Sequence, residues 1–178
     1  KSYPMKLEER LKERYLKANS KNIFKYIYYF FQRIKKERYC KHSYSGGAID
    51  LIVDYYFKNK KKGIYIDVGA FHPFNGSNTY KLFKRGWEGI NIDLDHQTID
   101  IFNHFRPSDE NICAAVSETV EEKNLYFHHN RSAINTIEER LGHRAKEIKK
   151  IKTECLNNII ENTKYKSSNI DFLSIDVE

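Results

Sequence analysis

The chain lacks any apolar run long enough to cross a membrane. A helix that spans a bilayer needs roughly 18 or more consecutive, mainly apolar residues. The closest segment, IFKYIYYFF at residues 23–31, is shorter and is interrupted by Lys25. No secretory signal is visible either, although the chain starts at Lys1 rather than at Met, so we expect the natural N-terminus to be missing.

Cysteine is scarce, with three residues far apart in the sequence: Cys40, Cys113 and Cys155. The absence of a C-x-x-C pair disfavours zinc ribbons and dithiol redox motifs. The adjacent His128 and His129 lack a second cluster of ligands, so we expect no metal site. Unpaired thiols are typical of reducing compartments, and the sequence therefore predicts a cytoplasmic protein.

A complete glycine-rich phosphate loop is also missing. The stretch GIYIDVGAFHPFNGSNTY, residues 63–80, starts like the first strand of a nucleotide-binding fold, with Asp67 and Gly69 at its end. Bulky residues then stand where further glycines would be: Phe71, Pro73 and Phe74. Pyrophosphate needs close approach of the backbone, so the pattern disfavours dinucleotides. A nucleoside without phosphates, such as S-adenosylmethionine, fits the pattern better.

Positive charge is present but unevenly distributed. The net charge is +7, yet residues 1–62 hold 17 Lys or Arg against 6 Asp or Glu. The basicity belongs to an N-terminal arm, residues 1–42, with helical spacing at 5–17 and an aromatic-rich helix from about residue 20 to 36. This arm could dock on an anionic membrane or an acidic protein, or it could be a solvated helix face. No nucleic-acid-binding motif accompanies it, so we expect no nucleic-acid partner.

After the arm, the sequence alternates between strand and helix. Predicted strands are 64–69, 87–94, 111–117 and 170–177; predicted helices are 48–59, 77–86, 96–105 and 156–164; 125–128 and 148–154 are strand-like excursions. Short apolar runs without alternation are typical of a parallel sheet covered on both faces. We therefore predict an α/β fold with a doubly wound, Rossmann-like sheet.

Ligands of such sheets bind at the carboxyl ends of the strands. Three of the four predicted strand ends carry a carboxylate: Asp67, Asp93 and Asp176. Asp93 follows Gly69 at about the 20-residue spacing of a ribose-binding acid. The alternative is that Asp93 only caps the following helix. Several carboxylates at one edge suit a cationic ligand, such as S-adenosylmethionine, better than a phosphate.

Three segments together resemble the FkbM-type family of class I S-adenosylmethionine-dependent O-methyltransferases: GIYIDVGAFHPFNGSNTYKLFKRGWEGINID, RPSDENICAAVS and NIDFLSIDVE. The resemblance covers about residues 43–178 and leaves the arm outside. It implies strand order 3-2-1-4, counted along the chain, in a sheet that normally has seven strands. We therefore expect a truncated domain whose fourth strand is an apolar edge, covered by an oligomeric partner or by missing chain.

The resemblance also implies roles for individual residues. Asp67, Gly69 and Ala70 would form the first cofactor motif, and Asp93 would bind the ribose. Further cofactor contacts would come from a second group: Ser77, Asn78 and Thr79 on the cofactor carboxylate, and Asp109 or Val116 near the adenine. Asp176 and Glu178 would lie beside the methyl group and the acceptor.

Two residues are candidates for the base that accepts the acceptor's proton, His72 and Asp176. For His72, the alternative is packing of the loop under Pro73. The segment 132–136 could line the acceptor pocket or could be a turn. By family analogy, the acceptor would be a hydroxyl of a sugar, a glycan or a similar metabolite. Two rival functions remain open: a non-catalytic α/β module whose arm docks on a membrane or acidic partner, and a nucleotide-dependent dehydrogenase or epimerase.

Overall fold

The computed structural model describes residues 23–39, 43–129, 132, 135–142 and 145–177. The chain forms two compact units, residues 1–42 and 43–178, and each is described by itself. The described part of the first unit is helix α2 (Ile23–Tyr39). Among the described residues, no helix has both the length and the apolar character needed to cross a bilayer.

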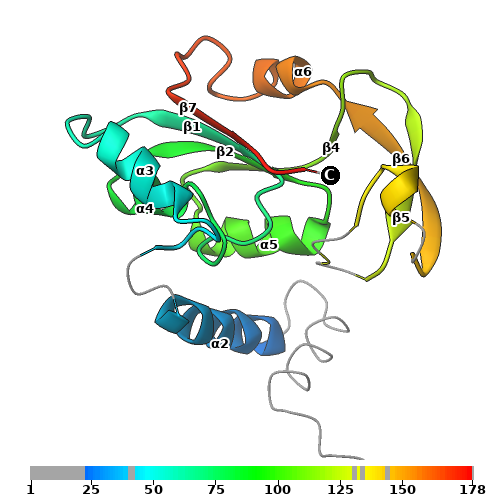
Figure 1. Cartoon of the computed structure of the whole chain (residues 1–178), viewed down its shortest axis with the longest axis horizontal. Helices are drawn as coiled ribbons and strands as arrows, with labels where there is room; N and C mark the ends of the chain where they lie inside the picture. Colours follow the sequence, from blue (N-terminus) through cyan, green and yellow to red (C-terminus); the bar gives the residue numbers. More distant parts are fainter. Residues whose placement is uncertain (1–22, 40–42, 130–131, 133–134, 143–144, 178) are drawn as a thin grey trace, which may run out of the picture. The chain divides into compact units, whose positions relative to one another are not determined.

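The second unit is a mixed α/β structure built on a parallel sheet (Figure 1). Its helices are α3 (Ile49–Tyr56), α4 (Tyr80–Lys84), α5 (His96–Phe105) and α6 (Leu156–Glu161), with a short 3-10 turn, η1 (Glu139–Leu141). Its strands are β1 (Ile64–Val68), β2 (Glu88–Asp93), β3 (Glu110–Cys113), β4 (Ala115–Val116), β5 (Glu122–Phe127), β6 (Glu147–Glu154) and β7 (Phe172–Ile175). The four-stranded sheet has the order β3-β2-β1-β7 with all pairs parallel, so the predicted order of these four strands is confirmed.

Helices cover both faces of this sheet. One face packs apolar strand residues against α6 and the turn after it: Ile66, Val68, Ile90 and Ile92 against Ile159 and Tyr165. On the other face, Tyr65 packs with Val53 of α3, Leu82 of α4 and Trp87. Coverage on both faces explains why the strands are short apolar runs instead of alternating ones.

The predicted third strand, residues 111–117, is wrong as a single element. It breaks at Ala114, whose backbone N–H donates to the carbonyl of Asp93 over 3.0 Å. β3 stays in the parallel sheet, whereas β4 pairs with β6 in a second sheet of order β4-β6-β5. The strand-like excursions are therefore β5 and β6, an antiparallel pair in this second sheet.

A row of polar side chains crosses the parallel sheet under α4 and α5. Ser174, Asp67, Asn91 and Asn111 are paired in register on four neighbouring strands, so their side chains lie on one face. The Asn91 amide donates to the Asn111 side chain over 2.8 Å. Buried polar groups are stable only when they are hydrogen-bonded, and this row therefore needs partners above it.

Arg106, directly after α5, supplies the main partner and is 0% exposed. Its guanidinium donates to Thr79 Oγ1 over 2.9 Å, to Asn91 Oδ1 over 3.4 Å and to Ser77 Oγ over 2.9 Å. It also donates to the carbonyl of Pro73. One buried side chain thus connects α5, the sheet and the loop that follows β1.

Three aromatic rings surround the guanidinium of Arg106. Its Cζ atom lies 5.3 Å from the centre of the Tyr80 ring and 5.2 Å from those of Phe83 and Phe102. Ring faces attract cations, and they also exclude water from the charge. Removal of the arginine would leave hydroxyl, amide and carbonyl groups without their donor in this dry environment.

The substitution Arg106→Met tests this arrangement. We expect the free energy of unfolding in urea to fall by about 3–5 kcal/mol, because a buried charge that satisfies several polar groups is lost. Arg106→Lys should lose less, since it keeps the charge but not the forked donors. Arg140→Met, at a mostly exposed side chain, is the control and should change the value by less than about 0.5 kcal/mol. A loss below about 1 kcal/mol for Arg106→Met would contradict the central role of this side chain.

Candidate functional site

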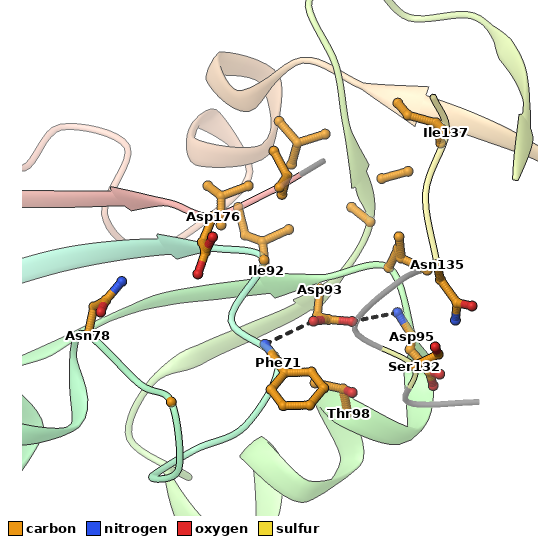
Figure 2. A pocket seen from close by; sticks show the side chains of 18 of the residues that line it. Phe71, Asn78, Ile92, Asp93, Asp95, Thr98, Ser132, Asn135, Ile137 and Asp176 are labelled. Carbon is orange, nitrogen blue, oxygen red and sulfur yellow. Dashed lines mark hydrogen bonds between the residues drawn. The ribbon is translucent and has the colours of Figure 1, made fainter. Parts of the chain in front are cut away.

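A cavity of about 650 Å³ opens at the carboxyl edge of the parallel sheet (Figure 2). Three parts of the second unit line it. The strand ends, the loops after them and the first turn of α5 give Val68, Gly69, Phe71, Gly76, Asn78, Ile92, Asp93, Leu94, Asp95, Thr98, Asp176 and Val177. Residues before and at the start of α3 give Ser45, Gly46, Gly47 and Ile49. The break before β4, β4 itself and the segment between β5 and β6 give Ala114, Ala115, Val116, Ser132, Asn135, Ile137 and Glu138. The position agrees with the rule that ligands of parallel sheets bind at the carboxyl ends.

Asp93, the last residue of β2, lies at the centre of this site (Figure 2). Its Oδ2 accepts from the backbone N–H of Phe71 over 3.0 Å, and its Oδ1 accepts from that of Asp95 over 2.8 Å. The carboxylate therefore connects the loop after β1 with the loop after β2. The alternative that Asp93 caps the next helix is wrong, because Asp95 is the N-cap of α5 and accepts from the N–H of Gln97.

Gly69 ends β1 in a turn that only glycine fits. Its φ is 77°, in the left-handed region, and its N–H donates to the carbonyl of Ile92 over 2.9 Å. A Cβ atom at this position would lie 2.1 Å from the backbone oxygen of Asp176. The absent side chain therefore lets the turn after β1 lie directly against the end of β7, and this brings Asp176 to the cavity.

Phe71 lines the cavity, which the sequence did not predict. From the sequence, its bulk indicates only a block to pyrophosphate. Phe71 has a φ of 49°, which is uncommon for an aromatic residue, and the residue is 36% exposed. The hydrogen bond from its N–H to Asp93 holds this conformation. An unfavourable backbone conformation beside a cavity is a mark of functional sites.

The structure brings together five of the predicted site residues: Gly69, Asn78, Asp93, Val116 and Asp176. Asn78 is held at both ends of its amide. Its Oδ1 accepts from the hydroxyl of Ser45 over 2.7 Å, and its Nδ2 donates to Ser174 Oγ over 3.0 Å. Asn78 thus joins the cavity lining to the polar row beneath.

Four other predicted cofactor residues are buried beside the cavity and do not line it: Asp67, Ala70, Ser77 and Thr79. The Thr79 hydroxyl donates to Asp67 Oδ2 over 2.7 Å, and Ser77 Oγ accepts from the N–H groups of Thr79 and Tyr80. Burial raises the pKa of Asp67, while Thr79, Arg106 and Ser174 oppose that rise. These residues therefore support the loop after β1 and do not face the cavity.

Asp109 lies at the other end of the sheet. It precedes β3, and its carboxylate accepts from the N–H of Gly89, near the start of β2, over 3.1 Å. The Asn91 amide and the Tyr65 hydroxyl also donate to it. Burial raises the pKa of Asp109. Because parallel strands start at one edge and end at the opposite edge, Asp109 is separated from the cavity. Asp109 and Val116 are the two residues predicted near the adenine, and of these Val116 lines the cavity.

Of the two predicted catalytic residues that the structure describes, Asp176 and His72, Asp176 lines the cavity and His72 does not. His72 is 2% exposed, and its Nδ1 accepts from the N–H groups of Phe74 and Asn75 over 3.3 and 3.2 Å. This geometry favours the loop-packing alternative for His72. Glu178 lies outside the described residues.

The wall opposite the strand ends comes from the segment between β5 and β6. Ser132 and Asn135 lie there, so this part of the predicted lining segment 132–136 reaches the cavity (Figure 2). Asn135 accepts from the N–H of His128 over 2.8 Å and donates to the carbonyl of His129 over 2.9 Å. The side chain thereby fixes the loop that faces Asp93.

The described lining is acidic. Four carboxylates contribute to it, and none of the described lining residues is Lys, Arg or His: the acids are Asp93, Asp95, Glu138 and Asp176. These charges also affect a neighbouring group. Burial, together with the charges of Asp93 and Asp95, raises the pKa of the Cys113 thiol. A cavity of this kind attracts cationic ligands and repels phosphates.

No model of a known protein family matches the chain, and no curated protein or solved structure matches it either. The resemblance to FkbM-type methyltransferases therefore stays a prediction from the motifs quoted above. A functional assignment depends on the geometry and charge of this cavity.

A pair of glycine substitutions tests the turn after β1. Gly76→Ala should cost about 1 kcal/mol of unfolding free energy, because Gly76 has a positive φ of 81° but open space around it. Gly69→Ala should cost at least about 2 kcal/mol more, since the new methyl group meets the Asp176 backbone. Equal losses in urea unfolding of the two variants would show that the close approach to β7 is unimportant.

Proposed function

We propose that the protein is an S-adenosylmethionine-dependent O-methyltransferase. The observation that carries this proposal is the position of Asp93. It ends β2 in an acidic cavity and is held by an N–H of the loop after β1, next to the Gly69 turn. An acid at this place suits the ribose of a nucleoside, and the cavity offers no described cation for a phosphate.

The Asp93 carboxylate can accept hydrogen bonds from a diol. Each carboxylate oxygen can accept more than one hydrogen bond, so ribose hydroxyls can bind while the amides of Phe71 and Asp95 keep the carboxylate in place. Phe71 provides an exposed ring beside it, which can contact a nucleobase through its face.

The acidic lining supports a cationic cofactor. S-adenosylmethionine carries a sulfonium and an ammonium group, and it supplies a methyl group to a nucleophile when bound. Asp176 directly follows β7 and lines the cavity from there, whereas Asp93 ends β2 (Figure 2). The two carboxylates together favour a ligand with a hydroxylated end and a positively charged end.

Asp176 is the residue that we assign to the acceptor's proton. Its backbone N–H donates to the carbonyl of Val68 over 2.9 Å, which fixes the residue at the sheet edge. Its side chain lines the cavity, whereas that of His72 does not. An alcohol becomes nucleophilic when a positioned base accepts its proton during attack, and the wall of Ser132 and Asn135 would orient the acceptor. The identity of that acceptor as a sugar or similar hydroxylated metabolite rests on family analogy.

Isothermal titration of the full chain tests the cofactor. We expect S-adenosylmethionine and S-adenosylhomocysteine to bind, and NAD and ATP not to bind, because the lining carboxylates repel phosphates. Asp93→Asn should weaken binding by about tenfold or more, since charge-assisted hydrogen bonds to the ribose are lost. Glu161→Gln, at an exposed acid outside the lining, should leave the affinity unchanged.

Absence of binding by both sulfur compounds would overturn the proposal and favour a non-catalytic module. Binding of NAD instead would favour the dehydrogenase or epimerase alternative.

A further inference from the structure

Helix α2 carries a stripe of exposed apolar side chains. Its members are between 44% and 65% exposed: Ile23, Tyr26, Ile27, Phe30 and Ile34. They recur every three or four residues, which places them within an arc of roughly 100° on a helix of 3.6 residues per turn. We call these five residues the α2 stripe.

The α2 stripe is not the face that α2 buries. Tyr28, Tyr29 and Gln32 are buried, and their spacing places them on the opposite side of the helix. The helix therefore has one buried face and a second, separate apolar face. An exposed apolar stripe of this size on a surface helix indicates an interaction surface.

Positive charge accompanies this stripe. Helix α2 contains five Lys or Arg and a single Glu, which gives a formal charge of +4. Arg33 is exposed and lies next to the stripe in the helical projection. In sequence, the whole arm 1–42 holds thirteen Lys or Arg against four Asp or Glu. The helix thus has an exposed apolar stripe with Arg33 at its edge, and an excess of positive charge overall.

We propose that the α2 stripe docks on an anionic lipid bilayer, with the helix lying in the plane of the interface. Helices with an apolar face and a basic polar face bind membranes in this orientation. Lys and Arg near the surface are attracted by anionic headgroups, while Tyr26 can place its ring at the apolar boundary and its hydroxyl among the headgroups. The charge complementarity favours a lipid surface over an uncharged protein groove. This proposal is independent of the enzymatic one.

Sedimentation of the full chain with lipid vesicles tests the proposal. We expect vesicles of phosphatidylcholine with about one third phosphatidylserine to bind at least about tenfold more protein than phosphatidylcholine alone. Binding should fall several-fold when the salt concentration rises from about 0.05 to about 0.5 M, because salt screens surface charges.

Two variants separate the apolar and the electrostatic contributions. Ile27→Ser combined with Phe30→Ser should lower the partition coefficient by about tenfold or more, whereas Ile148→Ser on β6, at a residue 60% exposed, should leave it unchanged. Arg33→Glu should weaken binding to the anionic vesicles more than Lys150→Glu, which makes the same change of charge on β6. All these positions are exposed, so thermal melting should show unchanged stability.

Three results would overturn the proposal: no binding to anionic vesicles, equal binding to neutral ones, or unchanged binding of the Ile27 and Phe30 variant. If soluble polyglutamate also displaces the protein from vesicles and the apolar variant binds polyglutamate normally, the arm recognises acidic polypeptide instead.

Discussion

The buried guanidinium of Arg106 is the interaction on which the second unit depends. It satisfies polar groups from the β1 loop, the start of α4 and the centre of the sheet, and three rings exclude water around it. A charge in such a place is tolerated only when hydrogen bonds compensate it, so the positions of Ser77 and Thr79, which accept from its two terminal nitrogens, are constrained together. The Thr79 hydroxyl in turn donates to Asp67 on β1, so Asp67 is held by the same network.

The shape of the cavity follows from this support. Because the loop after β1 is fixed from below, the turn at Gly69 can approach the end of β7, and the N–H of Phe71 can reach Asp93. Asp93 then holds both loops at the carboxyl edge, while Asp176 faces the same space from β7. The buried polar row supports the loops, and the carboxylates of the lining give the cavity its charge. The residues that support the fold are thus different from the residues that would contact a ligand.

Periodicity in the sequence predicted the parallel sheet and helix α5, whose bounds of 96–105 agree with the structure. Local patterns could not show the break at Ala114, since no Gly or Pro marks it, nor the burial of Arg106, a residue type that is usually exposed. Asp109 resembled a site residue by its motif, but it precedes a strand and so lies at the amino edge. The wall around Asn135 depends on long-range packing, which spacing alone does not reveal.

The most direct test of the account is an NMR titration of the ¹⁵N-labelled full chain with S-adenosylhomocysteine. If Asp93 binds the ribose, the amide signals of Phe71 and Asp95, which donate to its carboxylate, should shift on binding. The signal of Gly89, which donates to Asp109 at the opposite edge, should stay in place. Unchanged signals at Phe71 and Asp95, or shifts centred on Gly89, would contradict the assignment of the cavity as the cofactor site.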